Sequence, residues 1–482
     1  MTATAERSEL RAAREIVARL NDPETGERYE RWLERARGCR SPVRLRGVSR
    51  EADASTGKVV REFASEGEPD GVLLTPCGNR RACVCPACSE VYRGDAGQLV
   101  SAGLRGGKGV PDSVAGHPLV FATFTAPSFG PVHTIRNGGG KQLACRPRGR
   151  GETCPHGRSL ACNLRHAEDD PCLGEAICLD CFDYERCALW NLNVGRLFKR
   201  TKTYVERELA RQVGYTQKAT RSMVRVSYVK VAEFQRRGVV HFHVLWRLDG
   251  VDEDGQLVAP PAEFDAQLLA DAITAAMPKS TVPAEDERKD PYAWGTQHEV
   301  RVLDLEGDPR EAARVAGYIA KYTTKSTKDA GGIGYRIESA TELGHLACRE
   351  HARRLITSAW HAGEREEIDT KRVRRWAHQF GYGGHCFTKS RRFSTTFKAL
   401  REARAEHAAG RAPGASEASA KSDHHNLIRD GAWAYAGGGY RKAGDALLAD
   451  SSHARARENR RLAREAAMDE ASRANHEYGE TA

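Results

Sequence analysis

The sequence predicts an α+β fold centred on an antiparallel sheet of the split βαβ type. The stretch Leu119–Thr125 is apolar and is followed by Ala-Pro-Ser-Phe-Gly, which is typical of a buried strand and its end. The alternating segments Met223–Phe234 and Val239–Leu248 flank a short polar link and indicate a β-hairpin. One more strand is expected at residues 296–304.

Apolar residues at helical spacing fill the intervals between these strands. Residues 189–197 precede the hairpin, and residues 262–277 follow it. A further helix is expected at Arg310–Lys325, after the last strand. Upstream, we expect a helical start at residues 8–36 and a short hairpin at residues 43–63. The order strand, helix, strand, strand, helix, strand is that of a split βαβ unit, here with one extra helix.

The composition favours an anionic partner and argues against a membrane protein. The 482 residues include 75 Lys and Arg against 65 Asp and Glu, a formal net charge of +10. No segment approaches the roughly 20 apolar residues of a membrane span, and Met1–Arg14 is charged where a secretory leader is apolar. We therefore expect a cytoplasmic protein without a membrane partner. Its 14 cysteines are then metal ligands or reduced thiols rather than disulfides.

The triplet His241-Phe-His243 places two imidazoles on one face of a strand, since alternate residues share a face. Glu233 stands at the end of the partner strand, eight residues before His241. An even-length link would separate Glu233 from His241, so we predict a one-residue bulge at Gly238 that brings them together. This donor set suits a catalytic Mn²⁺ or Mg²⁺ on a phosphate oxygen. The alternative is a pair of solvent-facing histidines.

The predicted helix at 310–325 carries a second constellation. Tyr318 and Tyr322 are one turn apart, and Lys321 and Lys325 alternate with them at the same spacing. A phenol on a rigid helix can attack phosphorus and form a phosphotyrosine, while nearby lysines can lower the phenol pKa and hold phosphate charge. Alone, this pattern is typical of amphipathic packing, and it becomes specific only beside the histidine pair.

Cysteine-rich blocks predict structural zinc sites. Cys-x-x-Cys pairs can bring two thiolates to one ion, and redox activity is the alternative, but neither pair here has a thioredoxin-like βαβ setting. The first block contains Cys77, Cys83, Cys85 and Cys88; a second contains Cys154, His156, Cys162 and His166, enough for a site; and Cys178 and Cys181 form another pair. All of these except Cys83 are candidate zinc ligands. We expect buried thiols at Cys39, Cys348 and Cys386, while Cys145, Cys172 and Cys187 stay open.

Two basic segments are candidates for DNA contact because they combine cationic and aromatic residues. The alternative is a solvated basic helix. The candidate residues are Arg372, Arg374, Arg375, Lys389, Arg391 and Arg392. The Gly-rich links at 138–140 and 437–439 lack the Gly-Lys-Ser/Thr ending of a nucleotide site. A built-in helicase motor is therefore not expected, and a host helicase is the expected partner.

Three of these motifs together resemble the RepSA-like rolling-circle replication initiators of actinobacterial plasmids and integrative elements, in the HUH endonuclease superfamily. They are Phe121–Gly130, Val231–His243 and Tyr318–Tyr322. The segments Cys77–Arg81, Cys178–Cys181 and Gly383–Arg392 are also similar, so the resemblance spans most of residues 30–400.

The resemblance implies nicking at a double-strand origin, covalent attachment to the 5′ phosphate and termination by a second transfer. In related initiators the nucleophile follows an Ala-Lys pair, which points to Tyr322, and a glutamate commonly precedes it where this chain has Tyr318. Tyr318 is then either a second nucleophile or a structural residue. Single-stranded and double-stranded origin DNA are the implied partners.

This reading divides the chain into five parts. They are residues 1–70, an N-terminal helix and hairpin; 71–115, the first cysteine cluster; 116–335, an HUH nicking domain with a Cys/His-rich insertion at about 140–190; 336–400, a basic DNA-contacting region; and 401–482, a linker at 408–426 with a charged C-terminal helix. An HUH relaxase or transposase would use the same chemistry on other DNA. A zinc-containing DNA-binding regulator without enzymatic activity is the remaining alternative.

Overall fold

The computed structural model describes residues 3–23, 25–147, 152–305, 309–365, 370–410 and 427–479. The chain forms two compact units. One is built from both ends of the chain, Met1–Tyr92 with Leu400–Ala482, and the other is Arg93–Ala399. No helix among the described residues combines the length and the apolar character that crossing a membrane requires.

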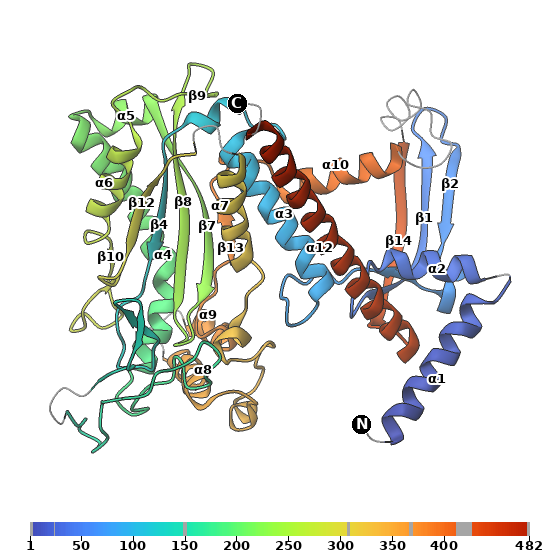
Figure 1. Ribbon diagram of the computed structural model, residues 1–482, viewed down its shortest axis with the longest axis horizontal. Helices are drawn as coiled ribbons and strands as arrows, with labels where there is room; N and C mark the ends of the chain where they lie inside the picture. The colour runs from blue at the N-terminus through green and yellow to red at the C-terminus, as the bar shows by residue number, and fades with distance from the viewer. Residues whose placement is uncertain are drawn as a thin grey trace. The chain divides into compact units, whose positions relative to one another are not determined.

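The unit Arg93–Ala399 is built on one antiparallel sheet (Figure 1). Its strands lie in the order β12 (Glu299–Leu303), β4 (Leu119–Phe124), β8 (Val240–Val251), β7 (Val224–Phe234) and β13 (Phe387–Lys389), and β9 (Leu257–Val258) pairs with the far end of β8. Numbered along the chain, the first four lie in the order 4-1-3-2, as expected for a split βαβ unit. The predicted mixed fold with an antiparallel sheet is confirmed.

Two helices cover one face of this sheet. They are α4 (Tyr184–Val213) and α6 (Ala266–Ala276), each capped by an aspartate side chain at its N-terminus. Phe124, Phe242 and Trp246 point to this face because they alternate with residues of the other face, and Phe198 of α4 packs among them. These fully or nearly fully buried rings form the centre of the core.

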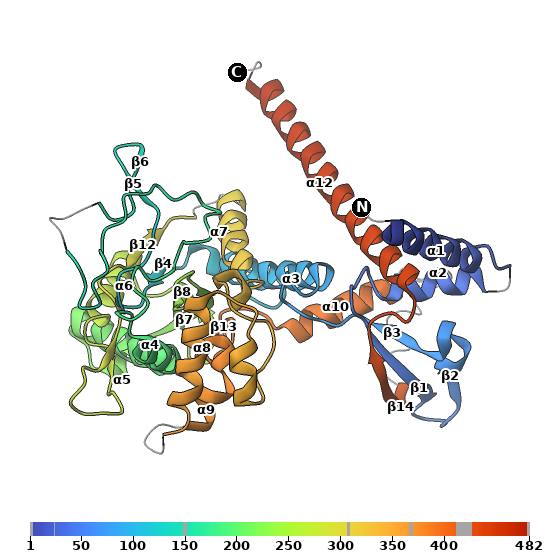
Figure 2. The same cartoon turned by 90° about the horizontal axis from the view of Figure 1, so that it is seen from below.

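The opposite face carries α7 (Pro309–Tyr322), which Figure 2 shows across β7 and β8 from α4. At the far end of this face, Arg247 and Asp249 form a buried ion pair at 2.5 Å, and Asp249 also contacts His117 and Ser227. Each of these polar groups has a partner, so their burial does not leave an isolated charge. The rest of the unit includes β5 (Arg136–Gly138), β6 (Lys141–Leu143), α5 (Gln217–Met223), β10 (Thr281–Val282), β11 (Tyr292–Ala293), α8 (Glu350–Ala362) and α9 (Thr370–Arg375).

The other unit contains a sheet in the order β14 (Leu427–Gly438), β1 (Val43–Asp53) and β2 (Val59–Ala64), with β3 (Leu73–Thr75) also on β1. Its helices include α1 (Ala3–Leu20), α2 (Gly26–Arg35) and α12 (Ala443–Gly479). Tyr29 donates a hydrogen bond to Asp445 at 2.5 Å, and Arg19 pairs with the same carboxylate at 3.2 Å. The N-terminal helices are therefore tied to the C-terminal one.

Two helices contain residues of both units because the boundaries between the units fall inside them. They are α3 (Pro86–Arg105) and α10 (Phe397–Gly410). The predicted hairpin at 43–63 corresponds to β1 and β2. The predicted linker at 408–426 begins inside α10, and its remainder, 411–426, lies outside the described residues. Strand β14 was not predicted from the sequence.

Candidate active site and metal-binding clusters

The β7–β8 hairpin brings the predicted acid to the histidine pair. Glu233 is the direct cross-strand partner of His241, with no shift of register between the strands. Gly238 donates its N–H to Gln235 at 2.8 Å and has a φ of +81°. A type I turn followed by a left-handed residue gives a three-residue hairpin loop with a G1 bulge. With Gly238 as its third residue, the loop has the odd number of residues that is needed to place Glu233 and His241 opposite each other. Glu233 therefore shares a face with both histidines.

Glu233 lies between a histidine and a lysine. Its Oε2 lies 3.2 Å from Nε2 of His243, and its Oε1 accepts a hydrogen bond from Nζ of Lys325 at 2.5 Å. The imidazole centroids of His241 and His243 are 4.6 Å apart. The structure therefore brings these four predicted residues together, from β7, β8 and the segment directly after α7.

Hydroxyl groups of β4 and the residue after it orient both imidazoles. Oγ1 of Thr123 lies 3.3 Å from Nδ1 of His243, and Oγ1 of Thr125 lies 3.3 Å from Nδ1 of His241. Gln235 Nε2 also lies 3.2 Å from Nδ1 of His241. Such outer contacts fix the ring orientation of a metal-binding histidine. Sequence reasoning assigned no role to these two threonines, although both lie in the first resemblance motif, Phe121–Gly130.

The protonation states suit a cation ligand set. Burial, with the neighbouring His243, lowers the pKa of His241 to about 4, so its imidazole is neutral at neutral pH. Burial alone would raise the pKa of Glu233, but hydrogen bonds with His243 and Lys325 outweigh burial and bring it below its usual value. The site thus offers one neutral imidazole and one carboxylate. Both are in the form that binds a divalent ion.

The potential ligand atoms of His241, His243 and Glu233 do not converge on one point. Among the described residues, three sets of His, Cys, Asp or Glu ligand atoms lie within 4.8 Å of one another, and His241, His243 and Glu233 do not form one of them. Glu233 instead shares its carboxylate between His243 and Lys325. The donor chemistry fits Mn²⁺ or Mg²⁺ with open positions, and an ion there would compete with Lys325 for Glu233.

Tyr322 lies directly against the histidine pair. Its ring stacks on His243 with centroids 4.7 Å apart and planes at 29°. Nζ of Lys325 lies 4.8 Å from the centre of the same ring. Helix α7 ends at Tyr322, three residues earlier than expected, so Lys325 folds back from beyond the helix end. The phenol, the acid and the lysine are therefore neighbours.

Tyr318 is the outer of the two tyrosines. Its ring centroid is 5.0 Å from that of Tyr322 and 5.6 Å from that of His243, and it packs edge-on against Phe121 of β4. The residue is 42% exposed. Both tyrosines thus touch the histidine pair, with Tyr322 the deeper one.

The ionisation of Tyr322 differs from the sequence expectation. Burial, the hydrogen bond with Tyr318 and the charge of Glu233 all raise the pKa of Tyr322 above its usual value. Lysines were expected to lower it. Lys325 pairs with Glu233, and the centroid of the Tyr322 ring lies 6.0 Å from Nζ of Lys321. In this arrangement the phenol is held neutral, and a further positive charge is needed to ionise it near neutral pH.

A cleft of about 1190 Å³ adjoins the histidine pair. Its lining includes Thr125 and Gln235, which both contact His241, together with residues 133–136 and 145–147 of the Cys/His-rich region. Arg237 braces one wall by donating hydrogen bonds to the carbonyls of Ala126 and Pro127 at 3.0 and 2.9 Å. The cleft therefore borders the candidate active site through these two contacts of His241.

The first set of potential metal ligands consists of four cysteines. Cys39, Cys77, Cys85 and Cys88 lie with all sulfur atoms within 4.8 Å. The Sγ atoms of Cys77 and Cys88 are 3.7 Å apart, as are those of Cys39 and Cys85. Cys39 is buried as expected, but the interpretation as a plain core thiol was incomplete, because it is the fourth member of this set. Cys83 is exposed and outside it.

The second set contains His133, Cys145, Cys162 and His166. His166 Nε2 points to His133 and Cys162, while its Nδ1 lies 2.7 Å from Asp170, and the hydrogen bond lowers the pKa of Asp170. An imidazole held by a carboxylate on its outer nitrogen is a recurrent feature of metal-binding histidines. Sequence reasoning left Cys145 open and did not name His133.

The third set joins Cys154 and His156 to Cys178 and Cys181. Nδ1 of His156 lies 3.2 Å from Sγ of Cys181. The proposed grouping of Cys154 and His156 with Cys162 and His166 was therefore wrong. The loops cross, so that each set takes ligands from two separated segments. Cys172 is exposed, Cys187 is buried, and Cys348 and Cys386 are half-buried rather than buried.

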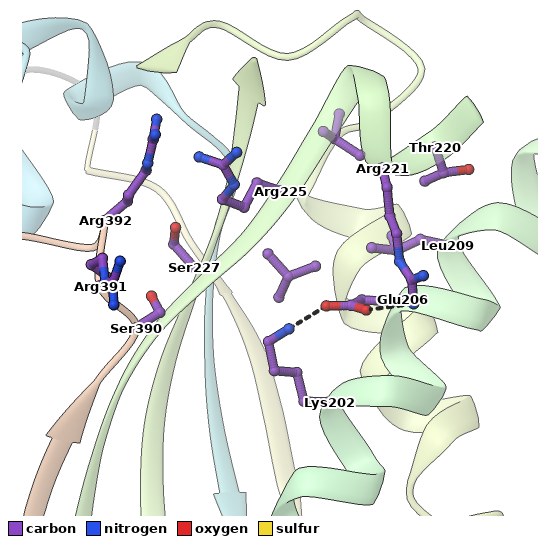
Figure 3. Close-up of a pocket in the computed structure, with 12 residues that line it drawn as sticks. Lys202, Glu206, Leu209, Thr220, Arg221, Arg225, Ser227, Ser390, Arg391 and Arg392 are labelled. Carbon is purple, nitrogen blue, oxygen red and sulfur yellow. Dashed lines mark hydrogen bonds and ion pairs between the residues drawn. The ribbon is translucent and has the colours of Figure 1, made fainter. Parts of the chain in front are cut away.

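The predicted basic residues fall in three settings. Arg372, Arg374 and Arg375 are exposed on α9, with Arg374 4.1 Å from the ring centre of Trp360. Lys389 turns inward, where its ammonium donates to the carbonyl of Ser394 at 2.6 Å and burial lowers its pKa. Arg391 and Arg392 are exposed and line a pocket beside β7 (Figure 3).

Comparison with known proteins assigns this chain to a family. The family model of RepSA, the replication initiator protein of pSAM2, matches residues 25–454. A replication initiator protein of Streptomyces ambofaciens is 38% identical over 458 residues, covering 92% of this chain and 94% of that protein. No solved structure matches. The chain is thus of the replication initiator class, which acts on origin DNA. It belongs to the RepSA family.

Proposed function

We propose that the protein starts rolling-circle replication by nicking one origin strand with Tyr322 and remaining covalently attached to its 5′ end. The sheet and α7 then form the core of an HUH endonuclease. The observation that carries the proposal is the stacking of Tyr322 on His243, beside the Glu233–Lys325 pair. Similarity to replication initiators over most of the chain favours replication over conjugative transfer or transposition.

In the proposed reaction, Oη of Tyr322 attacks the scissile phosphorus. The Tyr322 Oη–P bond forms and the P–O3′ bond breaks; the phenol loses its proton and the departing 3′ oxygen gains one. The ester energy is kept, so a free 3′ hydroxyl can later reverse the step and rejoin the strand. Lys325 and Lys321 lie where they can balance the phosphate charge.

His241, His243 and Glu233 are the residues proposed to hold Mn²⁺ or Mg²⁺. Such an ion would supply Lewis-acid polarisation of a phosphate oxygen and the further positive charge that ionisation of Tyr322 requires. The residues' own part is to present nitrogen and oxygen donors from adjacent strands, fixed by Thr123 and Thr125.

We further propose that the cleft beside His241 receives the single strand. Two of its lining residues, Thr125 and Gln235, contact His241, and its walls carry arginine side chains and polar groups suited to a nucleic acid. Origin recognition needs additional surface, for which the exposed basic residues Arg372, Arg374, Arg375, Arg391 and Arg392 are candidates, with Lys389 anchoring the last segment. A host helicase would separate the strands.

The decisive experiment is incubation of the purified protein with labelled single-stranded fragments of its own replicon and Mn²⁺. We expect a covalent protein–DNA adduct at one site, lost on chelation of the ion. Cleavage without any adduct would show that water is the nucleophile. Duplex binding without cleavage under any of these conditions would support the regulator alternative.

A further inference from the structure

A second pocket lies on the same structural unit, away from the histidine pair. It has a volume of about 430 Å³ and lies between α4, α5, the first residues of β7 and the segment that follows β13 (Figure 3). Its basic residues are Lys202, Arg221, Arg225, Arg391 and Arg392. We call it the arginine pocket. Only Arg391 and Arg392 were candidates from the sequence.

The charge of this pocket is strongly one-sided. Glu206 is the one acidic residue of its lining, and it is already paired with Lys202 and, at 3.2 Å, with Arg221. Among the described residues, Arg225, Arg391 and Arg392 have no carboxylate within ion-pair distance. These three guanidinium groups, from β7 and the 391–392 segment, therefore line the pocket outside any ion pair, and Asp249, the cross-strand neighbour of Arg225, is paired with Arg247 instead.

The hydroxyl groups of the pocket are already engaged. Ser227 donates to Asp249 at 2.6 Å, Ser390 exchanges hydrogen bonds with the backbone of Tyr228, and Thr220 donates to the carbonyl of Thr216 at 3.1 Å. By contrast, Nη1 of Arg225 is shielded from solvent without any hydrogen-bond partner in the described part of the chain. Nη1 of Arg392 already donates to the carbonyl of Gly255. The available donors are thus the guanidinium groups of Arg225 and Arg391 and the remaining N–H groups of Arg392, which match phosphate oxygens in geometry and charge.

The pocket also has a defined relation to the proposed active site. Arg225 and Glu233 lie eight residues apart on β7, so their side chains project from the same face of the sheet. Eight strand residues span about 26 Å. This is the length of about eight base pairs of duplex DNA, at 3.4 Å per base pair.

We propose that the arginine pocket binds a backbone phosphate of origin duplex DNA, about eight base pairs from the nick. This inference rests on the proposed function for the position of the nick, while the phosphate contact itself does not depend on catalysis. Arg225 is the central ligand, with Arg391 and Arg392 beside it. The contact fixes the duplex relative to the histidine pair and carries no base specificity.

The test combines a DNA modification with a protein variant. Single neutral methylphosphonates are placed in turn along both strands of the origin duplex, and affinity is measured with the full-length protein. Among the sensitive positions, we expect one cluster to lie about eight base pairs from the nick. In Arg225→Ala this sensitivity should disappear, the affinity should fall about tenfold, and the slope of log K against log salt should become shallower by about one unit. Arg225→Lys should keep part of the affinity and part of the methylphosphonate sensitivity.

Lys218→Ala is the matched control, because Lys218 is exposed on the same helix as Arg221 and does not line the pocket. It should leave the methylphosphonate profile unchanged. An Arg225→Ala protein with the wild-type profile and salt slope would overturn the proposal. So would binding of inorganic phosphate or a mononucleotide that depends on Arg225 while duplex affinity does not.

The adduct assay on short single strands separates this inference from the proposed function. A wild-type protein that forms no adduct, yet shows phosphate sensitivity that depends on Arg225, would retain the pocket and remove the nicking mechanism. An adduct without that sensitivity would retain the nicking mechanism and remove the proposed phosphate contact of the pocket.

Discussion

At the residue scale, the two tyrosines of α7 differ in their surroundings rather than in their chemistry. Tyr322 stacks on His243 and lies beside Lys325, whereas Tyr318 lies farther out and is 42% exposed. Spacing alone placed both on neighbouring faces of one helix and could not rank them. The structure shows that Tyr322 lies closer to the histidine pair and is less exposed than Tyr318, which favours Tyr322 as the nucleophile.

The first prediction concerns these hydroxyl groups. Tyr322→Phe removes the attacking oxygen and keeps the stacked ring, so it should abolish the covalent adduct with little change in melting temperature. Tyr318→Phe should retain initial nicking and lose termination if a second transfer needs that hydroxyl. Mass spectrometry of the trapped adduct decides between them. DNA found on Tyr318 of the wild-type protein would reverse the assignment.

Lys230 is a buried residue that the proposed chemistry does not use. Its ammonium lies 3.8 Å from the ring centre of Phe242 and 4.5 Å from that of Phe198, and the side chain is 7% exposed. Burial lowers the pKa of Lys230 to about 7. Because the unfolded chain then binds more protons between pH 7 and about 10, the free energy of unfolding should rise with pH across this window.

The second prediction follows from this shift. Lys230→Met removes the cost of burying an amine and should raise the free energy of unfolding at pH 7 by about 1–3 kcal/mol. The advantage of the variant should shrink toward pH 10, where the wild-type lysine is neutral in the folded state and the unfolded chain has begun to lose its proton as well. Urea unfolding at pH 7 and pH 10 measures both effects. An equal difference at the two pH values would contradict the assignment.

At the element scale, the hairpin turn sets the register on which the candidate site depends. Gly238 occupies a left-handed conformation, and a Cβ added there would lie 2.2 Å from Cδ1 of Leu355. The third prediction is that Gly238→Ala destabilises the protein by about 1–3 kcal/mol and slows nicking, because the turn shifts Glu233 relative to His241.

Gly214→Ala is the control for this prediction. Gly214 has a φ of +77° at the end of α4, but an added Cβ would meet nothing within 4 Å. It should cost about 1 kcal/mol through backbone strain alone and leave nicking unchanged. Equal losses of nicking in both variants would show that general destabilisation, rather than register, is responsible.

The three metal-binding sets are the second feature at this scale, and we propose that each holds one structural zinc. The fourth prediction is three zinc ions per chain by elemental analysis, two in Cys39→Ser, and three in Cys83→Ser, because Cys83 is exposed and outside the sets. Removing zinc should unfold the loops that the ligands hold. Purified, reduced protein without zinc would disprove the assignment.

The secondary-structure elements could be predicted from the sequence more completely than the grouping of the potential metal ligands. The strands, the hairpin and α7 follow from periodicities of two and 3.6 residues, which act over short distances. Cys39 lies 38 residues from Cys77, and His133 lies 33 residues from His166, so no local spacing links them. The crossing of the second and third sets likewise depends on how whole loops pack, which a Cys-x-x-Cys motif does not encode.

At the scale of the whole molecule, the unit formed from both chain ends depends on contacts between distant segments. Asp445 of α12 is 1% exposed and accepts hydrogen bonds from Tyr29 and Arg19. The fifth prediction is that Asp445→Asn, which leaves Arg19 and Tyr29 with a weaker partner, destabilises this unit by about 1–3 kcal/mol. Thermal unfolding measures it.

Asp450→Asn provides the comparison, because Asp450 is exposed and its contact with Arg40 is 3.5 Å long. Its effect should stay below about 1 kcal/mol. A similar loss in both variants would show that charge on α12, and not the buried contact, stabilises the unit. The sequence predicted a charged C-terminal helix but not this burial, since only one face of its first turns is covered.

Strand β14 pairs with β1 along the full length of β1, although the strands begin at residues 427 and 43. A ribosome adding about 5–20 residues per second needs about 20–75 seconds to pass from one to the other. Throughout that interval the edge of β1 that later receives β14 is an exposed template for aggregation or for chaperones. Incomplete chains from broken messages never cover it. Quality control can therefore remove them, so that the molecules persisting in the cell to act at an origin are those whose translation reached β14.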